Sequence, residues 1–266
     1  MTFRNQIYHG DCLRLIPQKL KNQSIDLVIT DPPFNILTKS DLQLEGRTPI
    51  IQHAEFDNEF DTFDQYLEFT RQWLTLLSPK MKPNSTLYAF FATQYISDFL
   101  RIAESIGFIR KNICVWVKCN PAPRIRKTNY LSAYESIIML VKGYPTFHFA
   151  GQNEMHNVFE YPLPSQKERL KYVNPETKEL ETLHPTQKPL DLIKRLILTS
   201  SEPHMLLCDP FVGTATTNIA ALETSRSCIG MEKNQLFYDH AKARLTHLVE
   251  RYGKYQNQPT IERFFK

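Results

Sequence analysis

The chain has 266 residues, with 32 Lys and Arg against 28 Asp and Glu, which gives a formal charge of +4. Eight Gly, 17 Pro and a hydrophobic fraction of 42% exclude a collagen-like, low-complexity or wholly disordered protein. Because the sequence has neither an apolar run long enough to span a membrane nor a signal-peptide stretch, we expect a cytoplasmic protein, built as one large domain or a domain with an insertion.

Short apolar runs rich in Ile and Val alternate with helical patterns along the chain. These runs predict buried strands at residues 5–8, 25–30, 86–91, 113–117, 137–141, 205–208 and 228–231, of which the first is the weakest. Apolar side chains at three- and four-residue spacing predict helices over 66–77 and 190–197. The alternation predicts an α/β fold with a mostly parallel, seven-stranded sheet and helices on both faces.

Two polar stretches interrupt this alternation. Residues 37–60 have no apolar period and are predicted to form a lid or binding loop. Residues 143–183 are polar and aromatic, and their prolines interrupt any helix, so we expect an insertion outside the sheet. The five cysteines are scattered without C-x-x-C spacing, which favours small buried hydrophobes and no metal site.

A rigid corner follows the strand predicted over 25–30. Asp31-Pro32-Pro33-Phe34 lies at its carboxyl end, where open α/β sheets bind ligands. The two prolines remove backbone N–H donors and leave carbonyl oxygens exposed. Asp31 and the Pro32 carbonyl could therefore accept hydrogens from the exocyclic amine of a planar ring, with Phe34 stacked on that ring. The alternative is a turn in which Asp31 caps a helix, because four residues are a weak pattern.

A second cluster lies between the strand predicted at 205–208 and a helix predicted from about residue 218. Asp209-Pro210-Phe211-Val212-Gly213-Thr214-Ala215 forms a tight loop, in which Gly213 allows close approach of the backbone to a ligand. This loop is not G-x-G-x-x-G, which disfavours a dinucleotide site. About twenty residues further on, Glu232 ends the next strand and is placed to bind ribose hydroxyls. Asp11, after the first strand, could receive an adenine amine.

Three motifs together resemble the signature set of the β-class amino-group DNA methyltransferases. They are Asp31-Pro32-Pro33-Phe34, His184-Pro185-Thr186-Gln187-Lys188-Pro189 and Asp209-Pro210-Phe211-Val212-Gly213, in the order found in that family. The resemblance covers most of the chain, from residue 5 to about residue 250. It implies a Rossmann-like methyltransferase fold that depends on S-adenosyl-L-methionine (AdoMet), with a circularly permuted motif order and a small target-recognition insertion.

The resemblance also implies a role for each motif. The target base would be flipped out of duplex DNA, and the catalytic residues Asp31, Pro32, Pro33 and Phe34 would direct its amine toward the methyl group of AdoMet. An Asp at the first position of this motif favours adenine, and cytosine-N4 stays open as a second target. Thr186 and Lys188 would meet the carboxylate of the cofactor. The full set of cofactor-binding residues is Asp11, Thr186, Lys188, Asp209, Phe211, Gly213, Thr214 and Glu232.

Ala215 is a departure from the family, whose loop usually reads G-x-G. Alanine is strained where φ is positive, so we expect AdoMet binding to be weaker or slightly displaced. The order of the motifs divides the chain into four parts. Residues 1–142 are expected to form the catalytic half, 143–183 the target-recognition insertion, 184–252 the AdoMet-binding half and 253–266 a C-terminal tail.

Two further segments point to partners. The basic residues Lys118, Arg124, Arg126 and Lys127 have no acidic residue between them and are predicted to contact DNA phosphates; the alternative is a solvated basic loop. The tail matches Q-x-x-[ILM]-x-x-[FY]-[FY] and resembles the PCNA-interacting peptide of clamp-binding proteins. Its clamp-binding residues would be Gln258, Ile261, Phe264 and Phe265. The alternative is that the two phenyl rings tuck back against the domain.

The leading hypothesis is an adenine-specific DNA methyltransferase that acts on double-stranded DNA and is tethered to PCNA. The tail would then imply an archaeal, nucleoid-associated protein. A dual-specificity enzyme, an RNA-directed enzyme and a non-catalytic DNA-binding or clamp-associated module on the same fold are the alternatives. Both a monomer and a homodimer stay open, and no membrane partner is expected.

Overall fold

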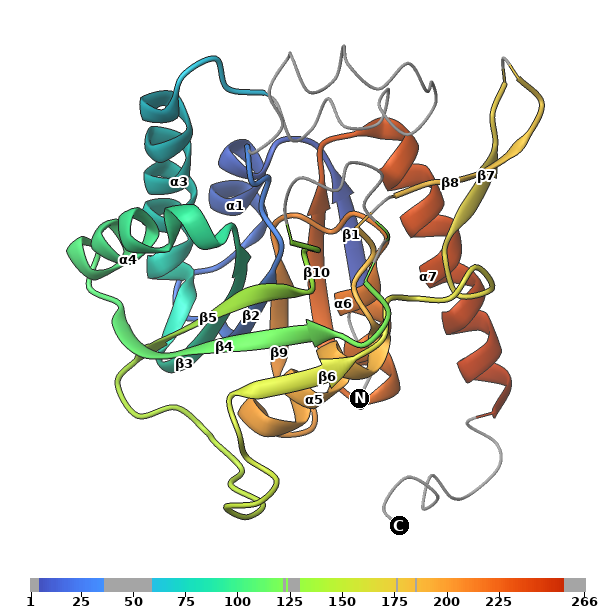
Figure 1. Ribbon diagram of the computed structural model, residues 1–266. Coiled ribbons are helices and arrows are strands. Elements are labelled where there is room, and N and C mark those ends of the chain that lie inside the picture. The colour runs from blue at the N-terminus through green and yellow to red at the C-terminus, as the bar shows by residue number, and fades with distance from the viewer. Residues whose placement is uncertain are drawn as a thin grey trace.

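An eight-stranded sheet forms the centre of the protein, in the order β1-β10-β9-β2-β3-β5-β4-β6 (Figure 1). The computed structural model describes residues 5–35, 59–121, 123, 130–175, 177–184 and 186–255. The strands are β1 (Asn5–His9), β2 (Ile25–Thr30), β3 (Met81–Phe91), β4 (Ile109–Lys118), β5 (Tyr134–Lys142), β6 (Val158–Tyr161), β9 (Leu206–Asp209) and β10 (Ser227–Glu232). Only β5 runs antiparallel to its neighbours in this sheet, so the predicted α/β class with a mostly parallel sheet is confirmed.

Helices cover both faces of the sheet. They are α1 (Cys12–Lys19), α3 (Phe63–Leu77), α4 (Ile96–Ser105), α5 (Leu190–Ser200), α6 (Thr216–Glu223) and α7 (Gln235–Tyr255), with short 3-10 helices η2 (Ser78–Lys80) and η3 (Thr93–Tyr95). Figure 1 shows α1, α3 and α4 grouped together, and their apolar side chains share one core cluster. Helices α5 and α6 pack on the opposite face with a second cluster. The sheet is therefore buried on both sides, as its continuous apolar strands require.

Strand β3 contributes side chains to the core clusters on both faces of the sheet. Leu87, Ala89 and Phe91 belong to the cluster beneath α1, α3 and α4, whereas Tyr88 and Phe90 belong to the cluster beneath α5. Successive side chains of a strand point to opposite faces, so an unbroken apolar run fills two cores at once.

The helix expected over 66–77 is α3, which begins three residues earlier, at Phe63, and packs as its apolar period predicts. Thr62 accepts a hydrogen bond from the Gln65 backbone N–H at 3.2 Å, and the Gln65 side chain accepts one from the Thr62 N–H, which forms a capping box. Tyr66, Trp73 and Leu77 are fully buried along one face of the helix. Its amphipathic period therefore sets the face that meets the sheet.

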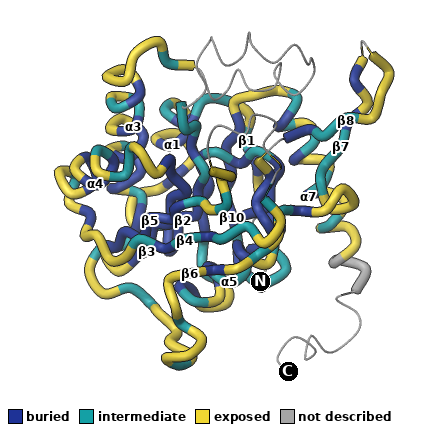
Figure 2. The backbone as a smooth tube through the Cα atoms, in the orientation of Figure 1, coloured by how far each residue is buried: buried dark blue, intermediate teal, exposed yellow. Residues whose placement is uncertain are grey.

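The segment 143–183 departs from the expectation of an insertion outside the sheet. Its strand β6 pairs in parallel with β4, and the Trp116 indole Nε1 donates a hydrogen bond to the Tyr161 carbonyl oxygen at 2.8 Å. Strands β7 (Lys171–Val173) and β8 (Leu180–Thr182) form a separate two-stranded hairpin that projects from the body of the protein. Figure 2 shows the connection between β5 and β6 largely exposed. Part of the segment thus extends the main sheet, and the rest lies outside it.

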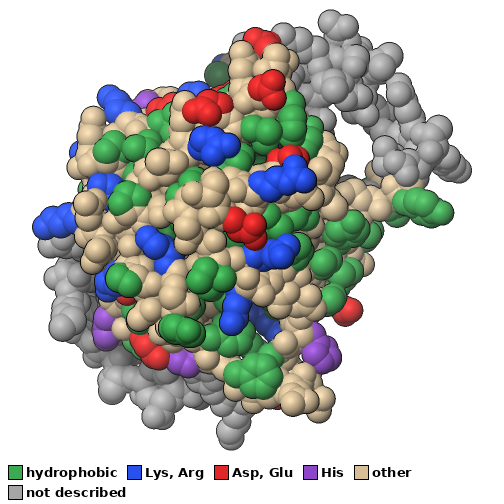
Figure 3. Space-filling model, turned by 90° about the vertical axis from the view of Figure 1, so that its left-hand side faces the viewer, with side chains coloured by type: hydrophobic (Ala, Val, Ile, Leu, Met, Phe, Trp, Pro, Cys, Tyr) green, Lys and Arg blue, Asp and Glu red, His purple; other side chains and the backbone are tan. Residues whose placement is uncertain are grey.

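Four of the five cysteines are buried, as the sequence predicts, whereas the exposed Cys119 departs from that expectation. Cys12, Cys114, Cys208 and Cys228 are buried free thiols, and Cys119 is exposed. On the face that carries α3 and α4, basic and acidic side chains are interspersed (Figure 3).

Among the described residues, no helix is long and apolar enough to cross a membrane. Residues 36–58, most of the predicted lid, lie outside the described part of the chain.

Candidate functional site

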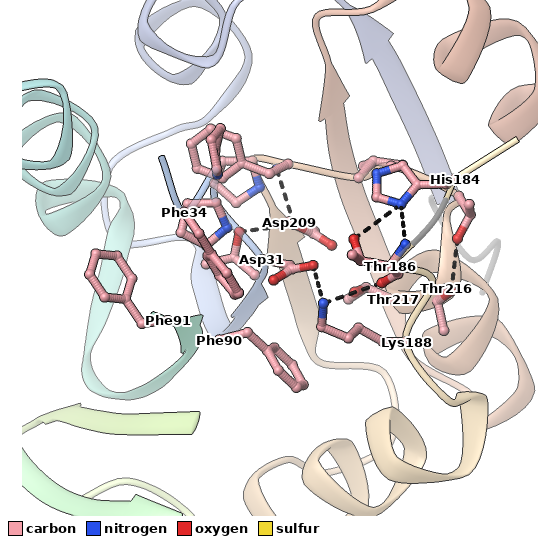
Figure 4. A pocket seen from close by; sticks show the side chains of 18 of the residues that line it. Asp31, Phe34, Phe90, Phe91, His184, Thr186, Lys188, Asp209, Thr216 and Thr217 are labelled. Atoms are coloured by element: carbon pink, nitrogen blue, oxygen red, sulfur yellow. Dashed lines mark hydrogen bonds and ion pairs between the residues drawn. The ribbon is translucent and has the colours of Figure 1, made fainter. Parts of the chain in front are cut away.

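The two clusters predicted from the sequence meet in one cavity. Strands β2 and β9 are parallel neighbours in the sheet, so the corner at 31–34 and the loop at 209–217 leave the same edge. The Thr30 hydroxyl donates a hydrogen bond to Asp209 Oδ1 at 3.0 Å, which ties the ends of the two strands together. A cavity of about 1110 Å³ is lined by both segments, as well as by Asp11, Lys118, Glu135, His184 and residues 186–188. Figure 4 shows the side chains that face one another there.

Asp31 is the carboxylate at the centre of the cavity wall. Its Oδ2 accepts a hydrogen bond from the Lys188 ammonium, and its buried Oδ1 has no hydrogen-bond partner among the residues that the structure describes. Burial raises the pKa of Asp31 to about 7, although the positive charge of Lys188 acts in the opposite direction. Asp31 caps no helix within residues 31–35, so the structural alternative considered for this motif does not account for it. A buried acceptor without a partner is costly and indicates a place for a ligand donor.

An aromatic wall stands beside Asp31. The Phe34 ring centroid lies 6.5 Å from that of Phe91, and the Lys188 Nζ lies 5.8 Å from the Phe34 ring and 5.1 Å from the Phe90 ring. Phe34 is half-buried, whereas Phe90 and Phe91 are fully buried. The wall therefore offers a flat apolar surface next to an acceptor oxygen.

Glu232 connects the end of β10 with the loop at 209–217. Its Oε2 accepts a hydrogen bond from the Gly213 N–H and its Oε1 one from the Asn234 N–H, both at 2.8 Å. Burial raises the pKa of Glu232 to about 7 even though these two donors act against the shift. Gly213 has a φ of +53°, in the left-handed region that favours glycine. The carboxylate thus holds the loop at the position where the backbone turns sharply.

Asp209 and Asp11 hold the backbone beside the cavity. Asp209 Oδ1 accepts a hydrogen bond from the Phe211 N–H at 3.1 Å, and burial raises the pKa of Asp209 to about 6. Asp11 Oδ1 accepts a hydrogen bond from the Leu13 N–H at 2.8 Å and forms the N-cap of α1. Both side chains border the cavity while they fix the turns that follow β9 and β1.

His184 and residues 186–188 form another wall of the cavity. The Thr186 N–H donates a hydrogen bond to His184 Nδ1 at 3.3 Å, and the His184 ring lies 4.9 Å from the Phe237 ring. The Lys188 side chain extends across the cavity to Asp31 (Figure 4). It also lies 3.4 Å from Glu135 Oε2, and Glu135 in turn lies 2.9 Å from the Lys118 Nζ. Glu135 is not among the site residues predicted from the sequence.

The DNA methylase family model matches residues 25–243, which is most of the chain. The chain belongs to the DNA methylase family. The Type II methyltransferase M.HinfI of Haemophilus influenzae is 31% identical over 258 residues, covering 92% of this chain and 69% of that protein. The Type II methyltransferase M2.LlaDCHI of Lactococcus lactis subsp. cremoris is 26% identical over 239 residues, covering 90% of this chain and 88% of that protein. The predicted family resemblance is therefore confirmed at the level of a DNA methylase.

Solved structures agree with this assignment. The complex of M1.HpyAVI with SAM has a TM-score of 0.66 and 28% identity, covering 90% of this chain and 98% of that one. The cytosine-N4-specific PvuII DNA methyltransferase has a TM-score of 0.69 over 97% of this chain and 95% of that one. Its identity of 19% makes it evidence for the fold alone.

The cavity of this methylase fits AdoMet, the cofactor predicted from the resemblance. A carboxylate at the end of β10, the left-handed backbone at Gly213 and the Phe211 ring, packed edge-on against Trp73 at 5.7 Å, line one continuous space. These features suit a ligand with a ribose, a carboxylate-bearing chain and an adenine ring. Glu232, Gly213 and Phe211 are the residues that would hold it. Within the described ranges no group of three or more His, Cys, Asp or Glu is placed to bind a metal ion.

The predicted site residues fall into three groups. The catalytic and cofactor-binding residues border one cavity, as their positions after neighbouring strands predict. Lys118 is expected on an exposed basic loop, but its side chain is only 12% exposed and its ammonium contacts Glu135 in the cavity wall. The remaining basic and clamp-binding residues lie outside the described part of the chain: Arg124, Arg126, Lys127, Gln258, Ile261, Phe264 and Phe265.

Ala215 adopts the left-handed conformation that the sequence analysis regards as strained, with a φ of +63°. Its methyl group is fully buried in a cluster with Ile7, Val212, Ala241 and Leu245, and Ala215 does not line the cavity. The left-handed conformation costs an alanine roughly 1 kcal/mol. Burial of the methyl group contributes a gain of similar size, about 0.8 kcal/mol.

We expect Ala215→Gly to change the free energy of unfolding by less than about 1 kcal/mol, because the two effects nearly cancel. The AdoMet dissociation constant should stay within about threefold of the parent value, because the methyl group faces the core. Calorimetric titration of both proteins measures this. An affinity gain of tenfold or more would show instead that Ala215 displaces the cofactor.

Proposed function

We propose that this DNA methylase transfers a methyl group from AdoMet to the exocyclic N6 amine of adenine within a specific short sequence of double-stranded DNA. The observation that carries the proposal is the buried, unpartnered Oδ1 of Asp31 in the cavity that also contains the loop at 209–217. The relatives named as Type II methyltransferases support a site-specific enzyme.

The residues of the corner account for activation of the amine. An aromatic amine is a poor nucleophile because its lone pair is delocalised into the ring. Asp31 Oδ1 and the Pro32 carbonyl would accept its two hydrogens and localise the lone pair on nitrogen, while Phe34 stacks on the ring. When bound, AdoMet supplies a methyl group on a positively charged sulfur. The ionised Asp31 would also stabilise the positive charge that develops on the amine nitrogen.

The position of Asp31 supports extrusion of the base. Its side chain is 23% exposed and lies in the cavity wall, so an amine within a stacked duplex could not reach it. The target adenine would therefore leave the stack before reaction. The cavity, at about 1110 Å³, has the size expected for a site that takes both a cofactor and a base.

We assign recognition of the sequence to residues 143–183, and phosphate contacts to the basic residues Arg124, Arg126 and Lys127. The β7–β8 hairpin projects from the body of the protein, and its Val173 and Leu180 side chains are 61% and 64% exposed. An exposed element next to the cavity is suited to contact base edges, while basic residues contact phosphates.

The identity of the modified nucleoside tests the proposal. Duplex DNA of mixed sequence is incubated with methyl-labelled AdoMet, digested to nucleosides and separated. The expected result is label in N6-methyldeoxyadenosine. Label in N4-methylcytosine would replace adenine by cytosine as the target. Label that appears only when RNA is offered, or in neither nucleic acid, would overturn the assignment.

The tail supports a second proposal, which is association with the PCNA clamp. On a single helical turn, Ile261, Phe264 and Phe265 would form one small apolar face, with Gln258 beside it. These residues lie outside the described part of the chain, and the argument rests on the sequence motif. The curated relatives named above are bacterial and give no support to an archaeal source.

We expect deletion of residues 258–266 to abolish retention by immobilised PCNA while methyl transfer without PCNA is unchanged. The double variant Phe264→Ala, Phe265→Ala should have the same effect, because these two rings supply most of the apolar contact. A pull-down with purified PCNA measures both. Retention equal to that of the full chain would refute the clamp proposal.

A further inference from the structure

Four charged side chains form one continuous chain of contacts in the cavity wall. Asp31 contacts Lys188, Lys188 lies 3.4 Å from Glu135, and Glu135 lies 2.9 Å from Lys118. Three of these residues are at strand ends or starts, since Asp31 follows β2, Lys118 ends β4 and Glu135 is the second residue of β5. Lys188 precedes α5. The contacts therefore join parts of the fold that are distant in the sequence.

Each member of this chain is largely withdrawn from water. The exposed fractions of the side chains are 23% for Asp31, 7% for Lys188, 16% for Glu135 and 12% for Lys118. Buried charges are unfavourable unless they are paired, and here two carboxylates and two ammonium groups alternate. Lys188 is held further by the faces of Phe34 and Phe90. Its ammonium thus has a fixed position between two carboxylates.

This position gives Lys188 a different role from the one that the resemblance implies. We propose that Lys188 is a positioning residue for Asp31, and that Glu135 holds Lys188 in its charged form while Asp31 gains and loses a proton. The inference rests on the proposed function of Asp31 toward the amine. Lys188 occupies Oδ2 of Asp31, which leaves Oδ1 for the substrate.

The proton balance explains why a second carboxylate is needed. As the amine nitrogen forms its bond to the methyl carbon, the bond from that carbon to the sulfonium sulfur would break and leave its electron pair on sulfur, as a neutral thioether. The nitrogen gains the positive charge that the sulfur loses and must release one proton. That proton passes to Asp31 Oδ1, and the electrons of the broken N–H bond stay on nitrogen. Asp31 is then neutral, and Lys188 would be left as an unpaired buried cation without Glu135. With Glu135 present, the ammonium keeps an ion pair until Asp31 returns its proton to water.

Lys188 and Glu135 have opposite effects on the pKa of Asp31. Burial raises the pKa of Asp31, Lys188 lowers it, and Glu135 and Asp209 raise it. Lys118 faces Glu135 from the other side. Removal of the positive charge at 188 should therefore raise the pKa of Asp31, whereas removal of the negative charge at 135 should lower it.

The test compares Lys188→Gln and Glu135→Gln with the parent protein. The control is Glu104→Gln, which removes a surface carboxylate of α4 that lies 3.9 Å from Arg110. The single-turnover rate on duplex DNA is measured against pH. Because Asp31 must be ionised, activity falls as the pH is lowered through its pKa. The pH at which the rate is half-maximal should be about one unit higher than in the parent protein for Lys188→Gln and about one unit lower for Glu135→Gln.

Two further measurements separate positioning from other roles. Carbon NMR of the Asp31 carboxyl group measures its pKa in the protein without AdoMet or DNA, independently of activity. This pKa should be higher than in the parent protein for Lys188→Gln and lower for Glu135→Gln. Calorimetric titration should give AdoMet dissociation constants within about threefold of the parent for both variants. Lys188→Arg, which keeps the charge, should restore the parent pH dependence.

Two outcomes would overturn the inference. The first is an Asp31 titration that is the same in Lys188→Gln, Glu135→Gln and the parent protein. The second is a loss of AdoMet affinity of tenfold or more in Lys188→Gln with no change in the Asp31 titration, which would assign Lys188 to the cofactor carboxylate. If the parent protein methylates neither DNA nor RNA, the proposed function fails, and the NMR titration still decides the electrostatic role of Lys188.

Discussion

Asp31→Ala is expected to lower the rate of methyl transfer at pH 8 by roughly 1,000-fold, which is typical when a preorganised group at the reacting centre is removed. The substitution removes the oxygen that would accept the amine hydrogen and the negative charge that would stabilise the developing cation. It also leaves Lys188 with Glu135 as the one carboxylate within 4 Å among the described residues. The loss should therefore appear in the single-turnover rate and not in the binding of substrate.

Binding measurements provide the control for Asp31→Ala. The dissociation constants for AdoMet and for duplex DNA should stay within about threefold of the parent values, because the residues assigned to those contacts are elsewhere in the cavity and on 143–183. Asp31→Asn keeps the shape of the side chain and should be nearly as slow, since it lacks the charge. A rate within tenfold of the parent for either variant would contradict the catalytic role of Asp31.

Glu232→Ala should weaken AdoMet binding by about 100-fold. A hydrogen bond to a charged group contributes about 1.5–3 kcal/mol, and each 1.4 kcal/mol corresponds to a factor of ten. The change would remove the carboxylate proposed to bind the ribose hydroxyls. It would also free the N–H groups of Gly213 and Asn234, which lose their acceptor and with it the shape of the loop.

Calorimetric titration with AdoMet measures the effect of Glu232→Ala, and Glu104→Ala is the matched surface control. Glu232→Gln keeps an acceptor oxygen and should lose only about tenfold, because its hydrogen bonds are no longer assisted by charge. Parent affinity in Glu232→Ala would show that AdoMet does not depend on this end of β10.

The sheet could be predicted from the sequence wherever a strand is buried on both faces. Residues 137–141 are an unbroken apolar run, and residues 25–29 are apolar except for Asp26; these segments form the central strands β5 and β2. Strand β6 escaped prediction because it has only four residues, of which Phe159 alone is buried. Its place depends on the Trp116 side chain and the free edge of β4, which no local pattern reveals.

The site was predictable to the level of its motifs. Ligands bind at the carboxyl ends of parallel strands, and this rule is enough to predict that 31–34 and 209–217 lie at one site. The contact between Lys188 and Asp31 joins residues 157 positions apart, and spacing alone carries no information about such a pair. Glu135 is an acidic residue at the start of an apolar strand, which was the one available signal for a functional carboxylate.

The pairing of β6 with β4 has a consequence for exchanging specificity between related methylases. Val115 to Lys118 of β4 are in register with Val158 to Tyr161, so the segment assigned to recognition and the wall containing Lys118 share one ladder. A chimera that replaces the whole of 143–183 would remove the edge strand β6 from the catalytic sheet. It would also remove the carbonyl oxygen that accepts the hydrogen bond of the Trp116 indole. Grafting only the hairpin beyond Tyr161 would leave that ladder intact, so modular transplantation should begin after β6.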